Sequence, residues 1–131
     1  MEIKDISVTR LMSTDLVTVS PDTSLTAAGE TMLEEGVGSV IVVEDDQPVG
    51  ILTSTDFVDL VTNGEVTTDT TVSTFMSEDM VTLSSADSMR DAAVTMMSDD
   101  IQHLPVEDDD GAIAGMLSTT DLTAHLSYLE G

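Results

Sequence analysis

With 26 acidic and only 3 basic side chains among its 131 residues, the chain carries a formal net charge of −23. Three scattered cations cannot neutralise the phosphates of a nucleic acid, and the absence of cysteine excludes disulfides, thiolate metal sites and thiol nucleophiles. No apolar run reaches the roughly 20 residues that span a bilayer, and the N-terminus lacks the basic and apolar regions of a signal peptide. We therefore expect a cytoplasmic protein with no membrane partner.

The first half of the chain alternates strand and helix patterns. A short apolar strand, VTV at 17–19, precedes a segment, 25–33, in which apolar residues recur at helical spacing. Two strands follow, SVIVVE at 39–44 and a second that ends at Leu52, with the turn residues DDQPVG between them. A closing helix has Phe57 on its apolar face.

The second half has the same order of elements. The segment NGEVTTDTTV at 63–72 joins the halves, VTL at 81–83 predicts a strand, and 89–97 has the helical spacing of apolar residues. The strand HLPVE at 103–107 and another ending at Leu117 precede the last helix. Neither half can bury much of a core alone, so we expect the two to pack on each other.

The two halves are copies of one unit. LMSTDLVTVSPDTSL at 11–25 aligns with FMSEDMVTLSSADSM at 75–89, an offset of 64 residues. The second copy then contains one additional residue, after which GMLSTTD at 115–121 aligns with GILTSTD at 50–56. Repetition of a supersecondary pattern on this scale indicates an internal duplication.

The repeated glycine motif has two interpretations. It places Thr53 and Ser118 at helix starts and Asp56 and Asp121 in the first turns, which is the pattern of a capping box. A carboxylate held there can also accept hydrogen bonds from the vicinal hydroxyls of a ribose, while the Ser or Thr hydroxyl donates to the sugar or to a phosphate. The local sequence leaves both interpretations open.

The ordered set of motifs, namely Met-Ser, VTVSPDTSL, an amphipathic helix, the strand HLPV, an acidic turn and the glycine motif, resembles a tandem CBS domain pair, or Bateman module. The resemblance covers residues 11–129. It implies an α/β (α+β) fold of two βαββα CBS repeats packed about a pseudo-twofold axis. The first repeat, with a lead-in segment before its first strand, is expected at 1–66 and the second at 67–131.

The resemblance also implies a function. Such pairs bind an adenosine ligand (AMP, ADP, ATP or S-adenosylmethionine) in clefts between the repeats, regulate an attached or partner protein, and often form homodimers. We therefore expect a stand-alone regulatory module, not an enzyme, that forms a homodimer. The sequence contains no P-loop and no HExxH motif, and it has only two histidines, which supports the absence of catalysis.

Carried over by position, the resemblance assigns Asp121 and Asp56 to ribose binding, with Ser118 and Thr53 as their hydroxyl partners. The other predicted nucleotide-binding positions of the Asp121 cleft are Thr14, Val37, Gly38, Gln102, His103 and Arg10. Those of the Asp56 cleft are Glu78, Ile101, Gln102, Gly38 and Ser39.

The two predicted clefts differ in charge. His103 and Arg10 can face a phosphate in the Asp121 cleft, whereas Glu78 brings a like charge to the Asp56 cleft. The family often carries Arg or Lys at such positions, and this departure argues against triphosphates unless Mg²⁺ bridges the phosphates and surface acids. His103 also has a structural interpretation, as a residue at the boundary of an apolar strand or at a dimer contact.

Two alternatives to nucleotide sensing remain. One is a ligand-free interaction module of the same fold that pairs with another protein through its helical face. The other is a divalent-cation sensor that uses the acidic turns EDD at 44–46 and EDDDG at 107–111. Acidic turns are expected in any protein of this composition, so the second alternative is the weaker one.

The acid excess predicts adaptation to high salt. Repulsion between surface carboxylates is largely screened at about 1 M salt, where the Debye length is about 3 Å. Because the acids are dispersed along the chain and do not form one block, we expect a protein from a halophilic archaeon. A mesophilic acidic protein is the alternative.

Removal of salt should unfold the protein, because its acids then repel one another with little compensating positive charge. The folded fraction, followed by circular dichroism across a KCl series from about 0.1 to 2 M, should rise with salt. A melting temperature that does not depend on KCl over this range would contradict the high-salt interpretation.

Overall fold

The computed structural model describes residues 6–64, 67 and 69–130, with side chains up to residue 126. Two compact units make up the chain, one of residues 16–80 and one of residues 1–15 and 81–131. The repeat boundary expected between 66 and 67 lies beside residues 65 and 66, which are outside the described residues, so it stays a prediction. Within the described part, no helix has both the length and the apolar character needed to cross a membrane.

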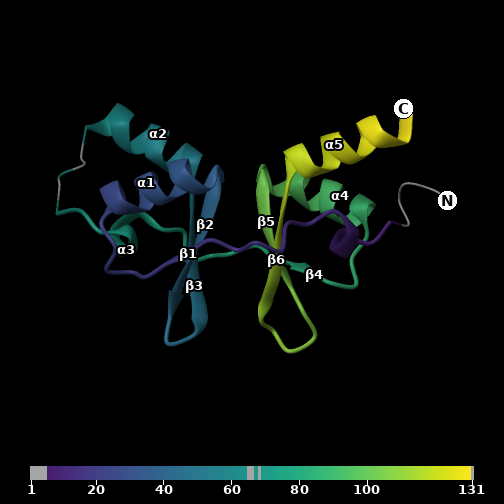
Figure 1. The fold of residues 1–131 in the computed structure, drawn as a ribbon, viewed down its shortest axis with the longest axis horizontal. Coiled ribbons are helices and arrows are strands. Elements are labelled where there is room, and N and C mark those ends of the chain that lie inside the picture. The colour runs from purple at the N-terminus through teal and green to yellow at the C-terminus, as the bar shows by residue number, and fades with distance from the viewer. Residues whose placement is uncertain (1–5, 65–66, 68, 131) are drawn as a thin grey trace. The chain divides into compact units, whose positions relative to one another are not determined.

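In the unit of residues 16–80, helices pack on a three-stranded sheet (Figure 1). The strand β1 (Thr18–Val19) pairs in parallel with β2 (Ser39–Glu44), and β2 pairs antiparallel with β3 (Gln47–Thr53). The helices are α1 (Leu25–Glu35), α2 (Ser54–Asn63) and the short α3 (Val72–Phe75). The buried core residues are Leu25, Ala28, Met32, Val40, Val42, Leu52, Leu60 and Val72.

The other unit repeats this arrangement. The strand β4 (Leu83–Ser84) is parallel to β5 (His103–Glu107), which is antiparallel to β6 (Ile113–Ser118). The helices are α4 (Met89–Asp99) and α5 (Thr119–Glu130). This unit also contains a 3-10 turn, Val8–Arg10, from the start of the chain. The buried core residues are Val8, Leu83, Ala92, Met96, Leu104, Val106 and Leu117.

Each repeat therefore has the predicted order of strand, helix, strand, strand and helix, and the predicted α/β fold class is confirmed. Local chemistry accounts for the helix bounds. The Ser24 hydroxyl accepts a hydrogen bond from the Ala27 N–H at 3.0 Å and caps α1. The same helix ends at Gly36, whose φ of 67° lies in the left-handed region that glycine adopts without strain.

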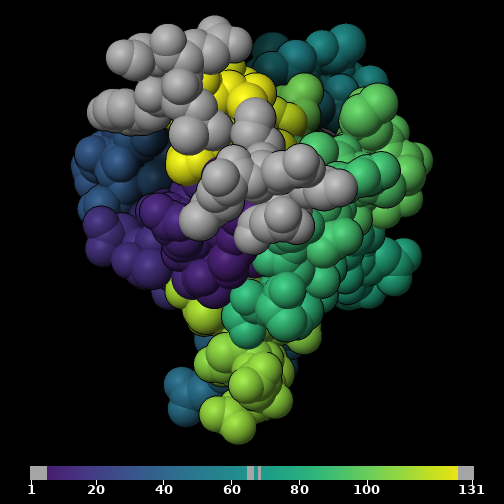
Figure 2. Space-filling model, turned by 90° about the vertical axis from the view of Figure 1, so that its right-hand side faces the viewer, coloured from purple at the N-terminus to yellow at the C-terminus, as the bar shows by residue number. Residues whose placement is uncertain are grey.

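The residues before the first strand of each repeat, 6–15 and 69–80, are here called the lead-in segments, and each packs within the unit of the other repeat. Val8 is fully buried in the second-repeat core, and its N–H donates to the Asp87 carbonyl at 3.0 Å. Figure 2 shows the first lead-in segment, in purple, against the green second repeat. Val72 is fully buried in the first-repeat core, and its N–H donates to the Thr23 carbonyl at 2.8 Å. The segment 63–72, expected only to join the halves, thus ends inside a core.

A close backbone approach explains the glycine of the repeated motif. In the unit of residues 16–80, Ile51 and Ser77 exchange two backbone hydrogen bonds, both at 3.0 Å. This pairing brings the lead-in segment over Gly50, where a Cβ atom would lie 2.8 Å from Met76 Sδ and 3.0 Å from the Ser77 carbonyl oxygen. The methionine end can move, but the backbone carbonyl cannot move without breaking the pairing.

The second repeat has the same contact. Ser13 and Met116 exchange backbone hydrogen bonds of 2.8 and 2.9 Å. A Cβ atom at Gly115 would lie 2.5 Å from Met12 Sδ and 2.9 Å from the Ser13 carbonyl oxygen. Glycine is therefore required at both positions because no side chain fits beneath the lead-in segment.

We expect Gly50→Ala and Gly115→Ala each to destabilise the fold by about 1–3 kcal/mol, the usual cost of overpacking. Thermal unfolding in high KCl measures the effect. The control is Gly29→Ala in α1, where a Cβ atom would meet the Phe57 ring at 3.4 Å, an ordinary contact distance. That change should be neutral or stabilising, because glycine weakens a helix interior by about 0.5–1 kcal/mol. Parent-like melting of both motif variants would contradict the steric explanation.

Candidate functional site

A hydroxyl–acid pair stands where β3 passes into α2. The Thr53 N–H donates to Oδ2 of Asp56 at 2.8 Å, and the Thr53 hydroxyl donates to the same oxygen at 3.3 Å. Both side chains are half-buried. The capping interpretation of the motif is therefore correct here, and one carboxylate oxygen of Asp56 takes both hydrogen bonds.

The equivalent pair at the start of α5 lacks the bond from the hydroxyl to the carboxylate. The Ser118 N–H donates to Oδ2 of Asp121 at 2.8 Å, and the Asp121 N–H donates to the Ser118 hydroxyl oxygen at 3.2 Å. The Ser118 hydroxyl thus acts as acceptor, so its own proton is available to another acceptor. The Thr53 hydroxyl proton, in contrast, is directed at Asp56.

Capping leaves part of each carboxylate unused. Among the described residues, no hydrogen bond reaches Oδ1 of Asp56 or of Asp121. An ionised carboxylate has about four acceptor positions, and the caps occupy two on Asp56 and one on Asp121. Helix capping and ligand binding by these aspartates are therefore compatible.

Sheet pairing places the predicted strand-start residues beside each pair. Ser39 is opposite Thr53 in the β2–β3 register, and the Gly38 carbonyl accepts from the Ser54 N–H at 2.9 Å. In the other unit, His103 is opposite Ser118, and the Gln102 carbonyl accepts from the Thr119 N–H at 3.0 Å. Gly38 and Ser39 thus lie with the Asp56 pair, and Gln102 and His103 with the Asp121 pair.

The lead-in segments add one predicted residue to each unit. Thr14 follows Ser13, which pairs with Met116, and Glu78 follows Ser77, which pairs with Ile51. Both predicted residues are exposed. Thr14 therefore belongs to the unit of Asp121, and Glu78 belongs to the unit of Asp56.

The remaining predicted residues fall into two groups. Arg10, at the end of the 3-10 turn, is exposed in the unit of Asp121. Val37 and Ile101 are half-buried and pack against the hydrophobic core of their own units. Val37 and Gly38 are in a different unit from Asp121, and Ile101 and Gln102 are in a different unit from Asp56, so these four cross-repeat assignments stay predictions.

His103 is close enough to Asp121 for the two charges to interact. Burial lowers the pKa of His103, and the Asp121 carboxylate opposes this shift without reversing it. The imidazole is therefore mostly neutral at neutral pH. It can therefore offer a ligand a neutral hydrogen-bond donor.

Sequence reasoning missed a third hydroxyl–acid pair at the start of α4. The Ser88 N–H and hydroxyl donate to Oδ2 of Asp91 at 2.9 and 3.1 Å, and the Asp91 N–H donates back to the Ser88 oxygen at 3.2 Å. Hydrogen bonds from Ser88 lower the pKa of Asp91. The Ser-x-x-Asp spacing was visible in the sequence, but Asp91 is exposed and no glycine motif precedes it.

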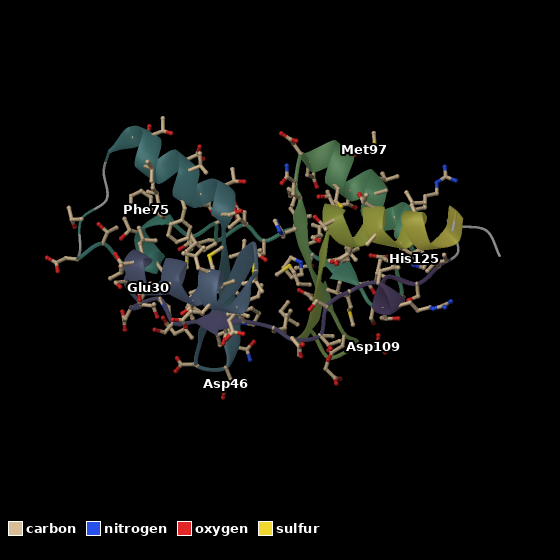
Figure 3. All side chains as sticks on the ribbon, turned by 45° about the horizontal axis from the view of Figure 1, so that its top comes forward. Glu30, Asp46, Phe75, Met97, Asp109 and His125 are labelled. Carbon is tan, nitrogen blue, oxygen red and sulfur yellow. The ribbon has the colours of Figure 1, made fainter. Side chains whose placement is uncertain are left out.

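The acidic turns, as the structure describes them, contain no ready-made cluster of cation ligands. Asp46 and Asp109 lie at the tips of the two hairpins (Figure 3). Oδ1 of Asp108 accepts from the N–H groups of Asp110 and Ala112 at 2.9 and 3.0 Å, so this carboxylate holds its own turn. No group of three or more His, Cys, Asp or Glu side chains able to hold a metal ion occurs among the described residues.

The lowered pKa of His103 has a measurable consequence. Because the unfolded chain binds the proton more readily, stability contributed by neutral His103 should be present above pH 6.5 and decline as the pH falls through that value. Titration of the imidazole by NMR should give a pKa below that of the chain unfolded in urea. Asp121→Asn should lower it further. A His103 pKa at or above the unfolded value would contradict this account.

Two segments, residues 3–63 and 72–128, match the CBS domain family. An uncharacterized protein of Methanopyrus kandleri is 30% identical to this chain over 129 residues. The alignment covers 97% of this chain and 66% of that relative's length. An uncharacterized conserved protein of Pyrococcus horikoshii has a crystal structure with a TM-score of 0.88 at 28% identity, covering 96% of this chain and 95% of that one. CBSX2, solved in complex with AMP, shares the fold with a TM-score of 0.82 at 23% identity, over 96% of this chain and 99% of that one. With two matching segments over most of its length, the chain belongs to the CBS domain family.

Proposed function

We propose that this chain is a regulatory module that binds an adenosine ligand in clefts between its two repeats and thereby modulates a partner protein. The observation that carries the proposal is Asp121, a half-buried carboxylate that caps α5 with Oδ2 and has no hydrogen bond to Oδ1 within the described residues. The crystal structure of CBSX2 with AMP supports an adenosine ligand, since that protein shares the fold.

The Asp121 pair has the donors and acceptors that a ribose requires. Oδ1 and the remaining positions on Oδ2 can accept from two vicinal hydroxyls, and charge-assisted hydrogen bonds of this kind are the stronger class. The Ser118 proton, which is not used in the cap, can be donated to a sugar or phosphate oxygen. Thr14, Gln102 and His103 add neutral polar groups in the same unit.

The Asp121 pair should bind AMP better than the Asp56 pair. In the Asp56 pair the Thr53 proton is already donated to the carboxylate, and Glu78 adds a negative charge within the same unit. A like charge near a partly buried phosphate costs more than about 1 kcal/mol, or close to tenfold in affinity. The Asp56 pair therefore suits an adenosine compound without phosphates, such as S-adenosylmethionine. A di- or triphosphate would need Mg²⁺ between its phosphates and the surface acids.

We also propose a homodimer that forms through the face of α4 and α5. Met97 and Val94 on α4 are 84% and 53% exposed, and Leu126 on α5 is 39% exposed. Exposed apolar side chains on neighbouring helices are typical of a protein interface. A module of this fold that binds no ligand and acts only through such a face is the alternative to nucleotide sensing.

Asp121→Ala should weaken AMP binding about tenfold or more, because it removes a charged acceptor of two hydrogen bonds, whereas Asp56→Ala should change it less than about twofold. Calorimetry in high KCl measures both affinities. In the parent protein, AMP at about 100 times its Kd should stabilise the fold by about 2.7 kcal/mol.

Both substitutions also remove a helix cap, which costs about 0.5–2 kcal/mol. Asp91→Ala removes the cap of α4 outside the glycine motif and is the matched control, so it should lower stability and leave AMP binding unchanged. A larger loss with Asp56→Ala than with Asp121→Ala would reverse the site assignment. No thermal shift with AMP, ATP or S-adenosylmethionine would favour the ligand-free interaction module.

A further inference from the structure

A histidine stands beside the Asp121 pair. His103 is the first residue of β5, is half-buried, and is opposite Ser118 in the β5–β6 register. Directly opposed residues of an antiparallel pair share one face of the sheet, with Cβ atoms about 4.5–5.5 Å apart. The Asp121 carboxylate is close enough to act on the charge of the imidazole. A hydroxyl with a free proton, a carboxylate and a titratable ring therefore lie together at the end of β6.

The elements around His103 bring a single charge to bear on it. The strands β4 and β6 contain no charged residue. Among the described residues, only Asp121 shifts the pKa of His103 through its charge. A further charge at this point must come from a ligand. The titratable and charged groups of the elements packed around the imidazole are Arg10 and Asp15 of the lead-in segment, Arg90, Asp91 and Asp99 of α4, Asp100 after α4, Glu107 of β5, and Asp121 and His125 among the described side chains of α5.

A phosphate bound here would change the charge of the imidazole. Burial lowers the pKa of His103, and the single carboxylate of Asp121 does not reverse this shift. A phosphate monoester, with a second pKa of about 6, brings close to two more negative charges at neutral pH. An opposite charge within about 4–6 Å shifts a pKa by about 1–3 units toward the charged form. A bound phosphate therefore adds to the effect of Asp121 and favours the imidazolium.

The chain has few other cations to offer an anion. Its bases are Lys4, Arg10 and Arg90, and Lys4 lies outside the described residues. Arg90 is exposed and acts on its neighbour Asp91, whose pKa it helps to lower. Arg10 is exposed at the end of the 3-10 turn. A proton taken up with the ligand would supply the positive charge that a chain of net charge −23 otherwise lacks beside its half-buried carboxylate.

We propose that His103 selects a phosphate-bearing ligand at the Asp121 pair, and that it does so by taking up a proton together with the ligand. The inference rests on the proposed function, because it specifies which adenosine compounds this pair prefers. The proton comes from solvent, and the resulting imidazolium donates a charge-assisted hydrogen bond to the phosphate without any covalent step. Affinity for a nucleoside monophosphate should rise as the pH falls, because the complex holds more protons than the free protein. Adenosine, which has no phosphate, should bind without this uptake.

The first repeat lacks the titratable group. Ser39 precedes His103 by the repeat offset of 64 residues and is opposite Thr53 in the β2–β3 register. A serine hydroxyl takes up no proton near neutral pH, so a ligand at the Asp56 pair should bind without proton uptake at the equivalent position. The duplication has therefore produced one pair linked to a histidine and one linked to a hydroxyl.

Proton uptake is measured by calorimetry with AMP, in KCl at a concentration that keeps the chain folded. Two buffers of equal pH and different ionisation enthalpy are compared, because the measured heat then differs in proportion to the protons taken up. At about pH 7, the parent should take up a measurable fraction of one proton for each AMP, and His103→Gln should take up none. The control is His125→Gln, which changes the other histidine of the chain, on α5 (Figure 3), and should leave the uptake unchanged.

The pH dependence of affinity separates His103 from the phosphate's own titration. The affinity of the parent divided by that of His103→Gln should rise about three- to tenfold between about pH 8 and pH 6. The phosphate titrates equally in both experiments, so its effect cancels from this ratio. With adenosine, the ratio should change less than about twofold. NMR titration of the parent needs no variant: AMP should raise the pKa of His103 above its value in the free protein.

Binding of AMP without proton uptake, or uptake that persists in His103→Gln, would overturn the proposal and leave nucleotide sensing intact. A ratio independent of pH, with a larger loss of AMP affinity in Arg10→Gln than in His103→Gln, would assign the selection to Arg10 instead. AMP binding that is lost with Asp56→Ala and kept with Asp121→Ala would also overturn it, because the ligand would then lie at the other pair. No AMP binding at any pH would refute the proposed function and this inference with it.

Discussion

The backbone pairing between each lead-in segment and the glycine motif is the constraint on which the candidate site depends. Ser13 pairs with Met116 and Ser77 pairs with Ile51, and both pairings require glycine one residue before the paired strand position. On the strand, the hydroxyl residue, Ser118 or Thr53, comes two positions after the paired residue. On the lead-in segment, Thr14 or Glu78 comes one position after the paired serine. One backbone contact therefore places both parts of each half-site, and the fold cannot lose it without losing the site.

Sequence patterns predicted the elements because each depends on local periodicity and capping, as with the helix that Ser24 begins and Gly36 ends. They did not predict the burial of Val72, because the core that holds this residue is made by elements that precede it in the chain. Val8 and Val72 are 64 residues apart, which is the offset between the two repeats, and this equivalence was the one indication of burial that the sequence offered. The reason for Gly50 and Gly115 was also hidden, since it lies in a contact with a distant segment.

The candidate site was predictable in residue type but not in hydrogen-bond direction. A Ser or Thr three residues before an Asp occurs at the start of α2, α4 and α5, and all three pairs form caps. What separates Asp56 and Asp121 from Asp91 is burial at the end of a strand, which no local pattern specifies. Whether the hydroxyl donates to the carboxylate, as that of Thr53 does and that of Ser118 does not, follows from side-chain geometry that only the folded structure contains.

The acidic surface opposes the binding of the anionic ligand proposed for this chain. A phosphate approaching a protein of net charge −23 is repelled, and salt that shortens the Debye length from about 10 Å at 0.1 M to about 3 Å at 1 M removes most of that repulsion. At high salt, therefore, nucleotide binding depends mainly on short-range contacts with the aspartate and the hydroxyl of the half-site. Selectivity under those conditions must come from shape and hydrogen bonding.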